Sequence, residues 1–151
     1  MTLSDLLSPS SVRVPLEAVD RETAISLLVE ALALPGAPDD LAQLKDAILA
    51  REQAGSTGIG NGVAIPHARS RWAAKPLLAV GRLAKPIDFS AADAKPVSLV
   101  FLLAVPETDP KSHLKVLAAL SRLASDAKLL KALNKTRAPE ELVALIAGVA
   151  L

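Results

Sequence analysis

The sequence predicts an α/β protein in which a mainly internal sheet is covered by helices on both faces. Segments with a helical period alternate along the chain with short apolar runs. Two of these runs, Leu77 to Leu83 and Val97 to Val105, have the length and composition of strands that are buried on both faces. At 151 residues the chain has the usual size of one globular domain, so we expect residues 1–151 to form one unit.

The N-terminal third is expected to form an edge strand and two helices. Alternation from Ser11 to Pro15 predicts a short edge strand, because proline cannot donate to a sheet ladder. A helix should begin after Asp20 as N-cap and end at Pro35-Gly36. A second helix, capped by Asp39, carries Arg51 in its last turn. The apolar stripes are Ala24, Ile25, Leu28 and Leu32 in the first helix and Leu41, Leu44 and Ile48 in the second.

The remaining elements follow the same signals. Val63 to Ile65 is expected to be a short buried strand that stops at Pro66-His67. Asp109-Pro110 should open a long helix, because proline is favoured at the first helical position. A short helix is predicted near Leu129 and Leu130, and a last one from Pro139.

Composition argues against several functional classes. Seventeen basic and sixteen acidic residues give a net charge of +1, and aromatic residues are only 2%, so we expect no nucleic-acid partner. The lack of cysteine excludes disulfides and thiolate metal sites. No apolar run approaches the roughly 20 residues of a membrane span, so we expect a cytoplasmic protein without direct membrane insertion.

Four of the seven glycines lie between Gly55 and Gly62. This segment is not a P-loop, because Asn61-Gly62 stands where lysine and serine or threonine are required. It is not a dinucleotide fingerprint either, because Val63 occupies the third glycine position. Two interpretations stay open: backbone N–H groups that line an anion-binding concavity, or a sharp turn without a ligand.

The only two histidines lie in different contexts. His67 follows Pro66 and should project from a constrained backbone at the rim of the sheet. His113 should lie in the first turns of the helix after Asp109, where the dipole favours a neutral imidazole and a nearby anion. With Arg51, these groups could supply a nucleophile and charge for phosphoryl chemistry. The alternatives are a surface histidine at position 113 and a solvated helix-end charge at Arg51.

Other chemistries fit the residues less well. A metal site would need a carboxylate from elsewhere besides the two histidines, so we expect neither a metal nor a cofactor. No Gly-x-Ser-x-Gly elbow is present to indicate a serine hydrolase.

The segment from Arg51 to His67, REQAGSTGIGNGVAIPH, strongly resembles the phosphorylation site of fructose/mannitol-type enzyme IIA domains of the bacterial sugar phosphotransferase system, including the nitrogen-regulatory IIA proteins. The resemblance continues through Pro86 to Phe89, Val97 to Val105 and His113-Leu114. It implies the family's fold, a mixed central sheet between helical layers.

The resemblance also implies a function and a site. His67 would accept a phosphoryl group from the phosphocarrier protein HPr or its nitrogen-branch relative, and would pass it to a IIB domain or use it as a signal. His113 would be the second active-site histidine. The predicted substrate-binding set is Arg51, which would steady the phosphoryl oxygens, and the loop residues Thr57, Gly58, Gly60 and Asn61.

The resemblance leaves the downstream partner open. His67 is followed by Ala68-Arg69, where many members have glycine and lysine, and Arg69, Arg71 and Lys75 form either a basic rim or a solvated loop. The alternative function is a regulatory module whose binding to a target protein is toggled by phosphorylation of His67. The chain carries no fused IIB or IIC segment, which favours regulation slightly. A decayed homologue is disfavoured because both histidines and Arg51 are present.

Overall fold

A computed structural model describes residues 1–8, 10–32 and 38–151. The helices are η1 (Leu3–Leu6), α1 (Arg21–Ala31), α2 (Pro38–Ala54), α3 (Pro110–Ala124), α4 (Ala127–Leu133) and α5 (Pro139–Ile146). The strands are β1 (Val12–Leu16), β2 (Gly58–Gly60), β3 (Val63–Ala64), β4 (His67–Ser70), β5 (Leu77–Ile87) and β6 (Val97–Pro106).

The six strands form one mixed sheet in the order β1-β5-β6-β3-β2, and β4 also pairs with β6. The β1/β5, β3/β6 and β4/β6 pairs are parallel, whereas β5/β6 and β2/β3 are antiparallel. The two apolar runs predicted as central strands are therefore confirmed as β5 and β6, and the mixed sheet is confirmed with them.

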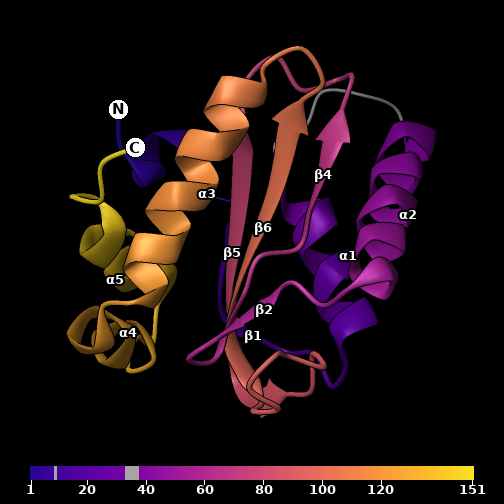
Figure 1. Cartoon of the computed structure of the whole chain (residues 1–151). Helices are drawn as coiled ribbons and strands as arrows, with labels where there is room; N and C mark the ends of the chain where they lie inside the picture. Colours follow the sequence, from indigo (N-terminus) through magenta and orange to yellow (C-terminus); the bar gives the residue numbers. More distant parts are fainter. Residues whose placement is uncertain (9, 33–37) are drawn as a thin grey trace.

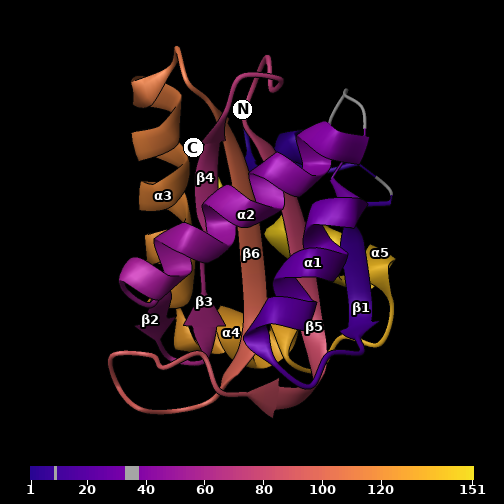
Figure 2. The same cartoon turned by 90° about the vertical axis from the view of Figure 1, so that its right-hand side faces the viewer.

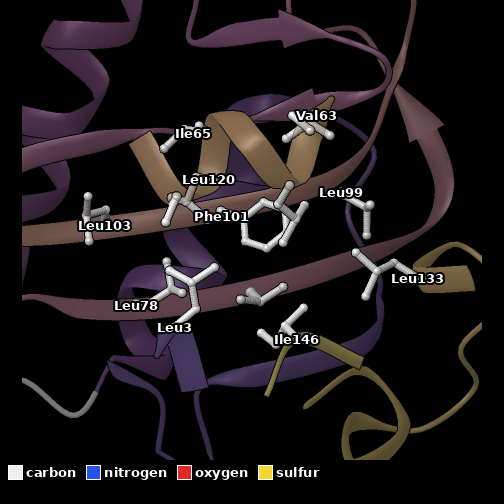
Figure 3. Close-up of a cluster of buried hydrophobic side chains, with 14 of the residues drawn as sticks. Leu3, Val63, Ile65, Leu78, Leu99, Phe101, Leu103, Leu120, Leu133 and Ile146 are labelled. Carbon is white, nitrogen blue, oxygen red and sulfur yellow. The ribbon is translucent and has the colours of Figure 1, made fainter. Parts of the chain in front are cut away.

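Helices cover both faces of this sheet. Figure 1 shows α3, α4 and α5 on one face and α1 and α2 on the other, and Figure 2 shows α1 and α2 lying across the second face. Alternate residues of β6 point to opposite layers: Leu99, Phe101 and Leu103 pack toward α3 and η1 (Figure 3), while Val100 and Leu102 pack toward α1 and α2. Both faces are buried, which is why this strand reads as a continuous apolar run.

The predicted helix starts are confirmed at Asp20 and Asp109. The Asp20 side chain accepts from the backbone N–H of Thr23 at 2.7 Å, and Asp109 accepts from that of Ser112 at 3.1 Å. The predicted cap at Asp39 is wrong, because α2 already begins at Pro38 and Asp39 lies in its first turn. The predicted terminator Pro35-Gly36 lies outside the described residues.

Around the glycine segment the structure contains two strands that the sequence does not predict, β2 and β4. Residues 58–60 form β2, which makes a hairpin with β3. The strand predicted from Val63 does end before Pro66, as β3, but the sequence does not predict that the chain resumes pairing with β6 as β4, from His67. Proline lacks only the N–H, and the Pro66 carbonyl still accepts from the backbone N–H of Leu103 at 2.9 Å. The edge strand predicted from Ser11 to Pro15 is confirmed as β1, and η1 was not predicted.

Gly81 of β5 packs closely against Leu16 of β1, and Gly148, which has open space around it, provides a control. A Cβ on Gly81 would lie 2.6 Å from Cδ2 and 3.3 Å from Cβ of Leu16, whereas a Cβ on Gly148 would meet nothing within 4 Å. We expect Gly81→Ala to lower the free energy of unfolding by about 1–3 kcal/mol through overpacking. Gly148→Ala should leave it within about 0.5 kcal/mol. Urea unfolding of both variants checks this, and equal stabilities would show that Leu16 relaxes without cost.

Candidate functional site

His67 is the first residue of β4, where it pairs in register with Leu103 of β6. Its ring is half-buried, and its Nδ1 atom lies 2.8 Å from the carbonyl oxygen of Ile65. A carbonyl oxygen can only accept, so Nδ1 carries the hydrogen and donates it. In the neutral ring the lone pair is then on Nε2. The local backbone therefore selects one tautomer and one nucleophilic nitrogen.

His113, in the first turns of α3, lies against this ring. The two ring centroids are 5.4 Å apart and the ring planes meet at 62°, an edge-to-face arrangement. The Nε2 atom of His113 is buried, and none of the described residues gives it a hydrogen-bond partner. A buried polar atom without a partner costs free energy. A hydrogen-bonding group that a ligand brings beside His67 could pair with His113 Nε2 and remove this cost.

The surroundings of His113 favour its neutral form. Burial, followed by the positive charges of His67 and Arg69, lowers the pKa of His113 from its ordinary value. The N-terminal end of α3 adds partial positive charge on the same side. The histidine pair thus combines an uncharged second imidazole with an electropositive setting suited to an anion.

Arg51 lies in the last turn of α2, as predicted, and its side chain is exposed. Its Nη1 donates to the carbonyl oxygen of Gly55 at 2.8 Å and so caps the end of its own helix. The structure thus joins the two histidines directly, while Arg51 is engaged by the loop that follows α2.

The glycine segment is shaped mainly by a tight turn. Gly60, Asn61 and Gly62 have φ values of +94°, +58° and +78°, and they connect β2 to β3. The Asn61 Nδ2 donates to the carbonyl oxygen of Ala124 at 2.9 Å, at the C-terminal end of α3. His113 is near the other end of that helix, about 16 Å away along its axis. Gly60 and Asn61 therefore shape the hairpin far from the histidine pair.

Backbone N–H groups of this segment already have acceptors. Thr57 donates to Glu52 Oε1 at 3.0 Å, Gly58 to Ser56 Oγ at 3.0 Å and Asn61 to Asp93 Oδ2 at 3.3 Å. Of the two interpretations that the sequence left open, the sharp turn fits these three residues, because their N–H groups already have acceptors. Gly58 is needed for close packing, because a Cβ there would lie 2.6 Å from that of Ala91.

A buried carboxylate, Glu52, was not predicted. Only 2% of this residue is exposed, and its oxygens accept from the backbone N–H and the hydroxyl of Thr57. The sequence does hold a signal for it: Glu52 continues the apolar stripe of Leu44 and Ile48 at the next helical step. A charged residue on a buried stripe indicates a satisfied internal group.

Several exposed side chains follow the two histidines in sequence. Arg69, Arg71 and Lys75 are exposed, and the Arg71 guanidinium lies 5.2 Å from the ring centroid of Trp72. Leu114, next to His113, is 68% exposed.

Two further findings concern metal clusters and membrane-spanning helices. Within the described ranges, no cluster of three or more histidine, cysteine, aspartate or glutamate residues could hold a metal ion. No helix in the same part of the chain is both long and apolar enough to cross a membrane.

The family follows from comparison with known sequences. The profile of the family described as "Phosphoenolpyruvate-dependent sugar phosphotransferase system, EIIA 2" matches residues 5–149. The chain belongs to this EIIA family, as the segment ending at His67 indicated.

Curated relatives include nitrogen regulatory proteins and fructose-specific components of the phosphotransferase system. The nitrogen regulatory protein of Bradyrhizobium diazoefficiens is 34% identical over 148 residues, which cover 97% of this chain and 95% of that protein. The fructose-specific EIIABC component of Bacillus subtilis is 33% identical over 146 residues. That match covers 97% of this chain but only 23% of the length of the fructose-specific relative.

Solved structures agree with the fold. The crystal structure of the nitrogen regulatory protein IIA-Ntr from Neisseria meningitidis has a TM-score of 0.82 at 31% identity, covering 95% of this chain and 98% of that one. Mannitol IIA of Escherichia coli, in a complex with phosphorylated enzyme IIB, has a TM-score of 0.76 at 19% identity, covering 95% and 99%. The second likeness shows the fold alone.

We expect NMR titration of the two imidazole rings to show His113 losing its proton at lower pH than an ordinary histidine, since its pKa is lowered. His67→Gln should raise the pKa of His113 only partly, because burial is the larger cause and the charge of His67 the second. In the wild type, the unfolded chain binds more protons than the folded one at pH values between the lowered pKa of His113 in the folded chain and its ordinary value of 6.5. The contribution of His113 to stability is therefore present above about pH 6.5 and is lost as the pH falls toward its folded pKa. Full return of the pKa to the ordinary value in His67→Gln would contradict this order of causes.

Proposed function

We propose that His67 accepts a phosphoryl group on Nε2 from the phosphorylated histidine of HPr or of a nitrogen-branch HPr-like protein. The group then passes to a IIB domain or acts as a regulatory signal. The observation that carries the proposal is the contact of His67 Nδ1 with the Ile65 carbonyl, which leaves Nε2 as the free nucleophile. Membership in the EIIA family supports it.

The transfer is a direct exchange between two imidazoles. The lone pair of His67 Nε2 attacks phosphorus as the P–N bond of the donor breaks, and the electrons of that bond return to the donor ring. The proton on Nδ1 stays in place. As the ring of His67 becomes positive, its hydrogen bond to the Ile65 carbonyl becomes charge-assisted and stronger, so the same contact stabilises the product.

His113 and Arg51 have supporting roles in this proposal. The unpartnered Nε2 of His113 can donate to a phosphoryl oxygen, provided the neutral ring carries its hydrogen there. Arg51 is exposed, and its guanidinium can exchange the Gly55 carbonyl for a phosphoryl oxygen, which is the stronger acceptor. Thr57, Gly58, Gly60 and Asn61 act on the shape of the segment rather than on the anion.

A regulatory role is the second candidate. It is supported by similarity to the nitrogen regulatory protein of Bradyrhizobium diazoefficiens, which is 34% identical over 148 residues. In this role phosphorylation of His67 adds negative charge beside Arg69 and the exposed Leu114, and so changes the surface offered to a target. Passage of the phosphoryl group to a purified IIB domain distinguishes transport from regulation.

The first test is phosphorylation of the purified protein. Incubation with phosphoenolpyruvate, enzyme I and HPr, or with the nitrogen-branch pair, should add one phosphoryl group, measured by intact mass at alkaline pH. The adduct should be acid-labile, and ³¹P NMR should place it on Nε2. His67→Ala should show no adduct, whereas Lys128→Gln, an exposed change on α4, should behave as the wild type. A wild-type protein that stays unmodified with both donor pairs would overturn the carrier function.

His113→Ala should slow phosphoryl transfer about 100-fold, because one donor to the phosphoryl oxygens is lost. The final level of phosphorylation should remain reachable, since His67 is intact. Quenched-flow measurement with phospho-HPr gives the rate, and Lys131→Ala on α4 serves as the matched exposed control. An unchanged rate would show that His113 does not touch the reacting group.

A further inference from the structure

We propose that Glu52 is a positioning residue that holds His67 in the tautomer with hydrogen on Nδ1, acting through Thr57 and Ile65. The consequence for phosphoryl transfer rests on the function proposed above. The effect on the tautomer does not, because it concerns the unphosphorylated protein alone.

The carboxylate of Glu52 is fixed from several directions. Its oxygens accept from the Thr57 N–H at 3.0 and 3.2 Å and from the Thr57 hydroxyl at 2.5 Å. The guanidinium of Arg21 on α1 lies 3.9 Å from Oε1. The Ser56 hydroxyl lies 3.3 Å from the same oxygen but donates its hydrogen to the closer Phe89 carbonyl, at 2.5 Å. Glu52 thus accepts two hydrogen bonds from Thr57 and faces one guanidinium, so the side chain needs acceptor oxygens at this position.

The hydrogen-bonded path from Glu52 to the imidazole is short. Glu52 fixes the N–H and the hydroxyl of Thr57, and the carbonyl oxygen of Thr57 accepts from the N–H of Ile65 at 3.1 Å. The carbonyl oxygen of Ile65 then accepts from His67 Nδ1 at 2.8 Å. The orientation of that last carbonyl decides which ring nitrogen carries the hydrogen.

Each link transmits position and not a proton. The donor and acceptor groups of Thr57 belong to different peptide units, and so do those of Ile65, so the coupling runs through backbone geometry. On its other side the segment is held by the bond from Leu103 N–H to the Pro66 carbonyl. Pairing with β6 also holds the chain before Ile65 and after Pro66, but these two residues lie between the paired stretches. Loss of the Glu52 contacts removes the support at Thr57, which lets the Ile65 carbonyl rotate away from the ring while the flanking strands stay in place.

The chemical consequence is specific. An imidazole without a fixed acceptor at Nδ1 takes up the tautomer with hydrogen on Nε2, which removes the lone pair from the nitrogen that attacks phosphorus. A merely structural role for Glu52 would change stability and leave the ring tautomer alone. The tautomer is therefore the property that separates the two roles.

The test uses the whole chain with ¹⁵N-labelled histidine. Wild type should show the ¹⁵N shifts of a single Nδ1–H tautomer at His67 above pH 7.5. Glu52→Gln should give a mixture with a substantial share of Nε2–H, and transfer from phospho-HPr should slow at least tenfold. Glu22→Gln, the same change at an exposed site on α1, should match the wild type in both measurements.

A second pair of variants keeps the test decisive if Glu52→Gln folds poorly. Thr57→Val removes the hydroxyl that donates to Glu52 and should shift the tautomer in the same direction, whereas Thr57→Ser keeps the hydroxyl and should restore the wild-type pattern. Wild-type tautomers in folded Glu52→Gln or in Thr57→Val would overturn the proposal. Failure of the wild type to accept a phosphoryl group would defeat the proposed function instead and leave the tautomer result to decide this inference.

Discussion

Strand β6 is buried along almost its whole length and hydrogen-bonds to β5, β3 and β4. The segment from Val63 to Ser70 pairs with β6 in two short parallel stretches, interrupted only at Ile65 and Pro66. A backbone held on both sides of a short interruption has little freedom. The position of His67 therefore depends on the packing of β6, which is held mainly by apolar side chains in both layers.

The electrostatics of the site follow from this placement. β4 pairs with β6, and α3 packs on one face of this sheet, so His67 at the start of β4 contacts His113 of α3. Both imidazoles are partly buried. Burial favours the neutral ring of His113, while Arg69 and the end of α3 keep the region electropositive. An incoming phosphoryl group thus meets fixed positive charge and the buried Nε2 atom of His113, which has no hydrogen-bond partner among the described residues.

The glycine segment has two different structural roles. Its first part, through Thr57, connects the buried carboxylate of Glu52 to the backbone next to His67. Its second part, Gly60 to Gly62, turns the chain and fastens the hairpin to the far end of α3 through Asn61. Neighbouring residues thus have separate roles, because Thr57 lies near His67 whereas the turn from Gly60 to Gly62 lies at the far end of the hairpin.

The sequence alone determined the two central strands, the helix starts at Asp20 and Asp109 and the segment that identifies the family, because periodicity, capping and motif are local properties. It did not determine the strand after Pro66, the start of α2 or the partners of the glycine-segment N–H groups. It also left Glu52 unnoticed, although the stripe of α2 passes through it. These features depend on which groups other elements bring near, and only the tertiary structure sets the 5.4 Å between His67 and His113 and the contact that fixes the tautomer of His67.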